Sequence, residues 1–296
     1  MTGKNNLDLS AEKQEVVMTF QYAHIRFYLW LSFAALAAFF YPLQLPAAEL
    51  FIGDKNAVAQ YTTSDKVLNR SLISGLKLTF GVAISKNDIY VANEDSGVIG
   101  KYSITGKALN ASLISGLHGP AGIAITGNRI FVANYRSDSI GEYTTSGRVI
   151  NAALISGLAG PEGLAVVGRD IYVVNFGAGT VGKYTLSGRV INSALISALP
   201  GPEGIAVAGD NLFLACDGAG TIGKYTLSGQ VVNAAFISGL HDPFGLATLG
   251  GRLFIAEQCA KGQIQEYTTA GKLVHLTLVR GLNYPGFLAV SHMHKP

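Results

Sequence analysis

Residues 161–201 read PEGLAVVGRDIYVVNFGAGTVGKYTLSGRVINSALISALPG, and the chain from about residue 50 onward consists of copies of this segment. The tyrosine of the segment recurs at spacings of 41, 41, 41, 41 and 42 residues. A repeat of this length indicates a protein built from stacked copies of one structural unit. The recurring tyrosines are Tyr61, Tyr102, Tyr143, Tyr184, Tyr225 and Tyr267.

Each copy contains four short runs that are separated by Gly, Pro, Asn or Asp. In the quoted copy these runs are residues 163–167, 170–175, 180–184 and 189–196. They are rich in Val, Ile and Tyr and have the length of β-strands rather than of helices. The connections are short enough for hairpins, and Gly188 supplies a residue that tolerates positive φ in the third turn. The segment therefore predicts a four-stranded antiparallel meander, whose members we call the first to fourth strands.

The two ends of the chain supply complementary parts of one repeat. The earliest copy of the second strand begins at Leu50, and no copy of the first strand precedes it. The final copy of the first strand lies at Gly286. A ring that closes by joining strands from both termini explains this division, and it leaves few sheet edges exposed. The sequence predicts an all-β fold, a six-bladed β-propeller of four-stranded antiparallel blades, in a single domain over residues 49–296.

Three recurring motifs carry a resemblance to known proteins. They are GPAGIAI at residues 119–125, IFVAN at residues 130–134 and IGKY at residues 222–225. In these motifs the chain resembles NHL-type propellers, and it is similar to streptogramin (virginiamycin B) lyase-like and gluconolactonase-like propellers. The resemblance covers residues 50–290.

The resemblance implies two classes of function. Binding members of the group recognise protein or nucleic acid through their surface, whereas enzymatic members use a divalent metal with a few acidic residues or histidines. The second strand typical of the lyases, similar to Trp-Phe-Thr-Glu, is represented here only by LFIAE at residues 253–257, which departs from the lyase pattern.

The amino-terminal part of the chain has the order of a secretory signal peptide. Residues 27–40 form an uncharged apolar run, with a positive residue before it and small residues after it. The run is short for a transmembrane helix. We expect residues 1–48 to be a leader that is cleaved after Ala47 or Ala48, with Met18 as an alternative start. The protein is then secreted or periplasmic; the alternative is a chain anchored in the membrane by an uncleaved helix.

Composition excludes several classes of partner and chemistry. The net charge is only +3, and no basic stripe is interleaved with aromatic residues, so we expect no nucleic-acid partner. The glycine-rich turns precede no helix, and no Gly-x-Ser-x-Gly, His-Glu-x-x-His or Cys-x-x-Cys motif is present. We expect a monomer that makes no membrane contact once the leader is removed.

Charged residues sort by the type of loop that carries them. In a meander, the loops that follow the second and fourth strands lie on one face, which we call the acidic face. The opposite face carries Lys86, Lys107, Arg129, Arg148, Arg169, Arg189, Arg252 and Lys272. The acidic face carries Glu94, Asp95, Asp138, Glu162, Glu203, Asp217, Asp242 and Glu257, with Arg136 and Lys261 as exceptions. These acids are either solvated turn residues or a surface that binds a cation or a cationic partner.

Residues that recur in every blade serve packing, so functional residues are expected among those that break the repeat. Cys216 and Glu257 break it at the end of the second strand. The candidates for a binding face are Arg136, Glu162, Glu203, Asp217, His241, Asp242 and Lys261.

The end of the second strand also suggests a metal site. Around the ring this position reads Asp54, Asn93, Asn134, Asn175, Cys216 and Glu257. Asn at a strand end is typical of an Asx turn. The carboxylates of Asp54 and Glu257 fall in adjacent blades, and oxygen ligands suit a hard divalent cation such as Ca²⁺ or Mg²⁺.

The cysteines and histidines leave alternatives open. Cys216 and Cys259 end second strands of neighbouring blades, and in an exported protein they are either bridged by a disulfide or free. His118 and His241 lie in loops of the acidic face, as an acid or base near the carboxylates or as exposed loop residues.

The sequence thus favours an exported propeller that acts as a binding or scaffold module through its acidic face, with a protein or small molecule as ligand. The alternative is a metal-assisted lactonase or a streptogramin-lyase-like enzyme at the mouth of the central channel.

Overall fold

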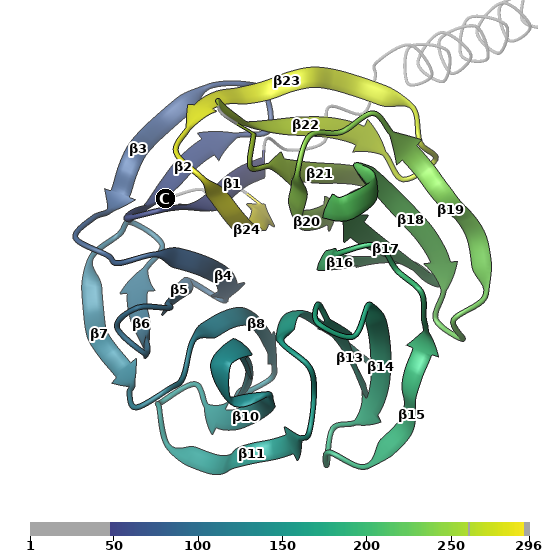
Figure 1. Cartoon of the computed structure of the whole chain (residues 1–296). Coiled ribbons are helices and arrows are strands. Elements are labelled where there is room, and N and C mark those ends of the chain that lie inside the picture. Colours follow the sequence, from purple (N-terminus) through teal and green to yellow (C-terminus); the bar gives the residue numbers. More distant parts are fainter. Residues whose placement is uncertain (1–47, 260, 293–296) are drawn as a thin grey trace, which may run out of the picture. The chain divides into compact units, whose positions relative to one another are not determined.

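The computed structural model describes residues 48–259 and 261–292. They form six four-stranded antiparallel sheets arranged as the blades of a ring, as Figure 1 shows. Two single 3₁₀ turns, η1 (Tyr135–Ser137) and η2 (Asp217–Ala219), interrupt loops after second strands. The predicted six-bladed β-propeller is confirmed. Among the described residues, no helix has the length and apolar character needed to cross a membrane.

Each blade runs from an innermost to an outermost strand. The innermost strands are β4 (Thr79–Ser85), β8 (Pro120–Thr126), β12 (Pro161–Val167), β16 (Pro202–Ala208), β20 (Pro243–Leu249) and β24 (Pro285–His292). The second strands are β1 (Ala48–Asp54), β5 (Asp88–Asn93), β9 (Arg129–Asn134), β13 (Asp170–Asn175), β17 (Asn211–Cys216) and β21 (Arg252–Glu257). The third strands are β2 (Ala57–Thr62), β6 (Val98–Ser103), β10 (Ser139–Thr144), β14 (Thr180–Thr185), β18 (Thr221–Thr226) and β22 (Gly262–Thr268). The outermost strands are β3 (Val67–Ile73), β7 (Ala108–Ile114), β11 (Val149–Ser156), β15 (Val190–Ile196), β19 (Val231–Ser238) and β23 (Leu273–Leu282).

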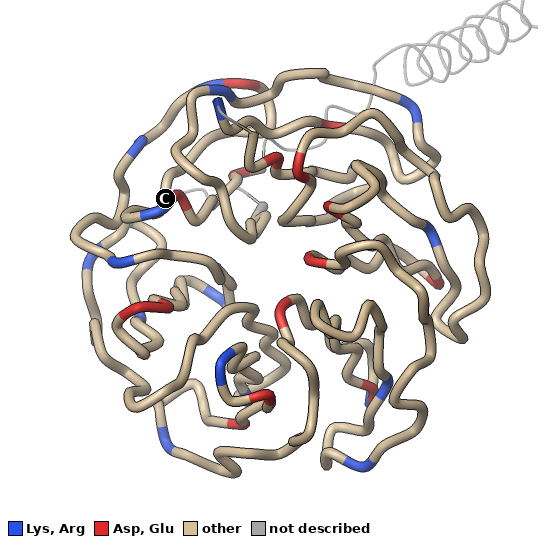
Figure 2. Tube along the Cα trace, viewed as in Figure 1, with Lys and Arg blue, Asp and Glu red and all other residues tan. Residues whose placement is uncertain are grey.

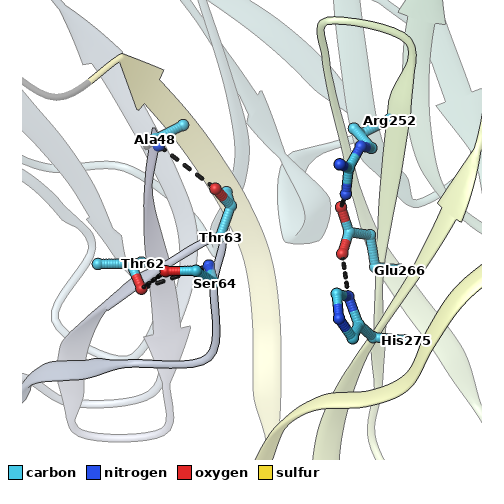
Figure 3. Close-up of polar contacts among 7 residues, drawn as sticks. All are labelled: Ala48, Thr62, Thr63, Ser64, Arg252, Glu266 and His275. Atoms are coloured by element: carbon cyan, nitrogen blue, oxygen red, sulfur yellow. Dashed lines mark hydrogen bonds and ion pairs between the residues drawn. The ribbon is translucent and has the colours of Figure 1, made fainter. Parts of the chain in front are cut away.

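The ring closes as the sequence predicts. Strand β24 from the carboxyl end pairs antiparallel with β1, with Leu50 opposite Val290. Strand β1 begins at Ala48, two residues earlier than expected. The Ala48 backbone accepts a hydrogen bond from the Thr63 N–H at 2.9 Å and donates one to Thr63 Oγ1 at 3.3 Å, the second of which Figure 3 shows. Ala48 is therefore part of the folded ring, and the rest of the expected leader, residues 1–47, lies outside the described residues.

The core lies between the blades, and the second strands form its centre. In β17, Leu212 and Leu214 pack with the preceding blade, whereas Phe213 and Ala215 pack with the following one. Side chains alternate across a strand, so a strand with apolar residues on both faces joins two interfaces. Burial of apolar surface contributes about 25 cal/mol per Å². The repeated Val, Ile and aromatic residues therefore hold each blade to both of its neighbours.

At the end of the blades away from the acidic face, an ion pair joins the second and third strands. From one blade to another, the strand that carries the acid and the strand that carries the base are exchanged. Lys101 pairs with Asp88 at 2.8 Å in one blade, but in the next blade Arg129 pairs with Glu142. In the blade of β20–β23, Glu266 is fully buried and contacts both Arg252 and His275, as Figure 3 shows. The acids of these pairs make the face opposite the acidic face less uniformly basic than the sequence analysis suggested. A similar pair joins Lys183 and Asp170 at 2.9 Å.

Candidate binding site at the ring axis

Each innermost strand begins with a β-bulge close to the ring axis. In the blade of β12–β15, Pro161 pairs with Asn175 and Leu164 with Val173, so three steps along β12 face two along β13. A bulge of this kind changes the direction of a side chain and often lies beside a functional site. The register shifts at the equivalent place in all six blades. The residues at the bulge are Phe80, Ala121, Glu162, Glu203, Phe244 and Gly286.

The bulged residues of successive blades lie against one another. A Cβ on Gly163 would stand 2.6 Å from the carbonyl oxygen of Glu203, and a Cβ on Gly204 would stand 2.1 Å from that of Phe244. In five of the six blades glycine follows the bulged residue, because the next blade's backbone occupies the space that a side chain would need. This spacing brings the Glu162 side chain next to Glu203.

Glu162 and Glu203 form a carboxyl pair. Their carboxyl groups are close enough to share a proton in a hydrogen bond, and the Oε2 atoms of both residues have no other partner among the described residues. Glu203 is only 6% exposed. Burial, reinforced by the neighbouring Glu162, raises the pKa of Glu203 to about 10, and burial also raises the pKa of Glu162. Two carboxyl groups that share a buried site cannot both ionise, so the pair keeps a proton at neutral pH.

Two more acids lie beside this pair. Asp217 begins η2, and its side chain hydrogen-bonds to Asp242 in the loop between β19 and β20. Burial and then the adjacent Asp242 raise the pKa of Asp217. Asp242 has a φ of +49°, a conformation that costs energy for a residue other than glycine. Figure 2 shows that acidic residues gather around the centre of the ring, whereas most Lys and Arg lie nearer its periphery.

Aromatic rings complete the other side of the axis. Phe80 and Phe244 come from blades separated by that of β24, yet their ring centroids are 5.5 Å apart. Gly286, the bulged residue between them, has no side chain that would separate the rings. The ring centroids of Phe287 and Phe244 are 4.9 Å apart, and those of Tyr284 and Phe80 are 6.4 Å apart with the two rings nearly perpendicular.

Three of these acids and two of the aromatic residues line one cavity of about 320 Å³, which we call the axial pocket. Two buried polar atoms of its lining, Glu203 Oε2 and Gln258 Nε2, have no hydrogen-bond partner among the described residues. A buried polar group without a partner is costly, which points to a ligand or water that satisfies it. The lining residues are Glu203, Asp217, Asp242, Phe244, Gln258 and Tyr284.

Arg136, a predicted site residue, is committed to other acids. Its guanidinium lies 2.9 Å from Glu94 and 3.5 Å from Asp95 on the second-to-third-strand loop of the preceding blade. Burial raises the pKa of Glu94, and the Arg136 charge opposes that rise. Arg136 therefore links two neighbouring loops, and it does not line the axial pocket.

Glu257 and Asp54, the predicted metal ligands, accept hydrogen bonds within the protein. Glu257 is fully buried and accepts from the backbone N–H of His241 at 2.9 Å and from the side chains of Gln263 and Gln265. Asp54 accepts from the backbone N–H of Asn283 at 2.5 Å. Both carboxylates thus fasten the loop that enters the first strand of their own blade.

The asparagines at the ends of the other second strands, unlike these two carboxylates, have side-chain oxygens that accept no hydrogen bond from the described residues. The Oδ1 atoms of Asn93, Asn134 and Asn175 are buried and have no partner among the described residues, so the expected Asx turns do not form. Within residues 48–259 and 261–292, no three or more His, Cys, Asp or Glu side chains are grouped so that they can hold one metal ion. A metal at Asp54 and Glu257 stays a prediction.

Both cysteines are free thiols. Cys216 packs in the core between its own blade and the preceding one, with Tyr172 and Leu199, whereas Cys259 belongs to the following blade. Alternation along β17 turns Cys216 away from that blade. Burial raises the pKa of Cys216 to about 11. Of the two alternatives for these cysteines, the structure therefore has the unbridged one.

The structure thus gathers Glu203, Asp217 and Asp242 of the predicted residues around one cavity, with Glu162 paired behind them. His241 and Lys261 do not line it. Sequence reasoning missed Tyr284 and Gln258, although one signal was available. The loop before the final innermost strand reads NYPGF at residues 283–287, where two other copies have GPEG and one has GPAG. Tyr284 therefore stands at the position that glycine occupies before the proline in those three copies.

Comparison with known proteins gives the fold. No family model matches the chain, and no curated protein matches it. A structure described as a nidogen/laminin complex covers 82% of this chain and 98% of its own, with 15% identity and a TM-score of 0.70. Virginiamycin B lyase from Staphylococcus aureus covers 72% of this chain and 77% of its own, with 17% identity and a TM-score of 0.58. A protein of unknown function from Bacteroides caccae covers 84% and 100%, with 18% identity and a TM-score of 0.66.

Proposed function

We propose that this protein is an exported binding module whose acidic face recognises a partner carrying positive charge. Similar propeller folds occur in the structure described as a nidogen/laminin complex and in a lyase. The observation that supports the proposal most directly is the convergence of Glu203, Asp217 and Asp242 on one pocket that no Lys or Arg lines. Carboxyl groups held close together without counter-ions raise the free energy of the unbound protein, and a cationic partner lowers it.

The first experiment measures binding of a fluorescein-labelled oligolysine peptide to the purified protein by fluorescence anisotropy. An oligoglutamate peptide of equal length is the comparison. We expect saturable oligolysine binding that weakens as salt rises, because charge pairs near a surface are screened. The variant Asp242→Asn should weaken binding.

A matched control separates the acidic face from general charge. Asp65 lies in an exposed turn on the opposite face and has a φ of +73°, which asparagine also tolerates. Asp65→Asn removes the same charge and should leave binding unchanged. Equal effects of the two variants, or equal binding of oligolysine and oligoglutamate, would sink the proposal.

The proposal of export rests on the leader-like segment and on the position of Ala48 in β1. Cleavage after Ala47 preserves the Ala48 pairing with Thr63, whereas cleavage after Ala48 removes it. Expression of the full chain in a bacterium, followed by mass spectrometry of the exported product, should give an amino terminus at Ala48. A product that stays in the cytoplasm with residues 1–47 attached would overturn export.

The rival prediction of a metal-assisted enzyme has its own test. Calorimetric titration with Ca²⁺, Mg²⁺ and Zn²⁺, repeated on Glu257→Ala, measures whether a divalent cation binds. Micromolar binding that the variant loses would favour the enzyme and justify lactone and lyase assays.

A further inference from the structure

We propose that the axial pocket holds a primary ammonium group at the end of an alkyl chain, such as the side chain of a peptide lysine. This inference rests on the proposed function and assigns the site and the chemical group within the acidic face. It depends on the cavity, on the arrangement of its acids and aromatic rings, and on its two buried atoms without partners.

The geometry of the acids favours an organic cation over a metal ion. Glu203, Asp217 and Asp242 line one cavity but come from three separate elements: β16, η2 and the loop between β19 and β20. They are not grouped closely enough to ligate one metal ion together. An ammonium group presents three N–H donors that can be divided among separate acceptors, and it does not require the tight shell of ligands that a metal ion needs. A guanidinium prefers instead the two oxygens of a single carboxylate, with which it forms parallel hydrogen bonds.

Glu203 gives the pocket a buried acceptor. The residue is 94% shielded from solvent, and apart from the carboxyl contact with Glu162 its Oε2 has no hydrogen-bond partner among the described residues. A protein without a ligand gains no stability from such an atom, whereas an ammonium donor would satisfy it.

The other lining residues suit the alkyl chain and its backbone. Phe244 and Tyr284 provide aromatic surface beside the acids, and aromatic faces attract cations as well as methylene groups. Gln258 Nε2 is a buried donor without an acceptor. A peptide carbonyl near the lysine would supply that acceptor. The cavity volume of about 320 Å³ lies at the lower end of the range for ligand pockets and suits one side chain rather than a large ligand.

Binding is linked to the proton of the carboxyl pair. An ammonium beside Glu203 favours its ionised form, so the ligand displaces the shared proton, and each rise of one pH unit strengthens binding by up to about tenfold. The limit is set by the ligand, because an alkylammonium loses its own proton near pH 10.4. Several titratable groups surround the pair of Glu162 and Glu203, either by acting on its charge or by lining the axial pocket. They are Glu94, Tyr135, Asp217, Asp242 and Tyr284.

The test is calorimetric titration of the purified protein with Nα-acetyl-lysine methylamide. We expect saturable binding, about tenfold tighter at pH 8 than at pH 7, with heats that differ between phosphate and Tris buffers because a proton is released. The Nε-acetylated form, which lacks the charge, should not bind. The arginine analogue should bind at least about tenfold more weakly.

Two variants locate the site. Glu203→Gln should abolish both binding and the buffer dependence, and Asp242→Asn, at the exposed rim of the pocket, should weaken binding without disturbing the buried pair. Asp65→Asn is the control and should bind as the unaltered protein does. Circular dichroism and thermal unfolding show whether each variant is folded.

The outcomes separate this inference from the proposed function. If oligolysine binds but the lysine derivative does not, or if Glu203→Gln binds the derivative normally, the acidic face is a binding surface and the assignment of the pocket is wrong. If the arginine analogue binds as tightly as the lysine derivative, the assignment of a primary ammonium is wrong. If neither oligolysine nor the derivative binds, both proposals fail.

Discussion

Replacement of Glu203 by Gln should stabilise the folded protein at neutral and alkaline pH. The native carboxyl keeps its proton because its pKa is about 10 in the fold, compared with 4.5 as its ordinary value. The unfolded chain releases that proton above pH 4.5, so folding takes up a proton, and stability falls as pH rises through the window from 4.5 to about 10.

The magnitude follows from that window. One pH unit corresponds to about 1.4 kcal/mol, so the two and a half units between 4.5 and neutral pH amount to about 3 kcal/mol. Gln has nearly the same shape, is neutral in both states and can donate its amide hydrogen to Glu162. Glu203→Gln should therefore exceed the unaltered protein in free energy of unfolding by about 3 kcal/mol at pH 7, and the difference should grow by about 1.4 kcal/mol per pH unit.

Urea denaturation at a series of pH values between 4 and 9, monitored by far-ultraviolet circular dichroism, measures this difference in the free energy of unfolding. The two proteins should have equal stability near pH 4 and diverge above it. Asp65→Asn, on an exposed turn, is the matched control and should follow the unaltered protein. Parallel stability curves for Glu203→Gln and the unaltered protein would refute the shared proton.

Two further substitutions test the packing that supports the site. Arg252→Ala should destabilise the fold by about 3 kcal/mol in urea denaturation, because it leaves the fully buried Glu266 carboxylate with one partner fewer; an unchanged midpoint would contradict this. Gly204→Ala should cost about 2 kcal/mol or more and lower the thermal midpoint, because the new Cβ would stand 2.1 Å from the Phe244 carbonyl oxygen. Gly168→Ala is the control, because a Cβ at Gly168 would meet no other atom. The positive φ of Gly168, +59°, adds a backbone cost to that variant, which the comparison of the two thermal midpoints includes.

The fold could be predicted from sequence because the repeat states it six times. Strand β13 has the bounds that its Val, Ile and Asn pattern predicts, residues 170–175. The division of one blade between the two termini predicted the pairing of β24 with β1. These inferences needed only periodicity and turn chemistry, which act locally and recur in every copy.

The site was harder to predict because it depends on side-chain direction. Glu162 and Glu203 could be selected as departures from the repeat, but their contact follows from the bulges and from the close approach of neighbouring blades, which no local pattern reveals. The cysteines show the same limit. Their separation in the chain permits a bridge, yet alternation along β17 places Cys216 in the interface with the wrong blade.

Departure from the repeat has two physical origins, and Glu257 and Glu203 exemplify them. Glu257 replaces the usual Asn, and its own blade supplies Gln263 and Gln265 as donors, so the change is compensated by further changes nearby and serves the loop that begins at His241. Glu203 has no such compensation, since its neighbour Glu162 is another carboxyl and its Oε2 has no donor among the described residues. A buried carboxyl group whose donors changed with it is structural, whereas one whose neighbour is only another carboxyl keeps an energetic cost that a donor from a ligand would remove. The uncompensated departures, rather than all departures, therefore support the proposal that the ring binds a partner at the axial pocket.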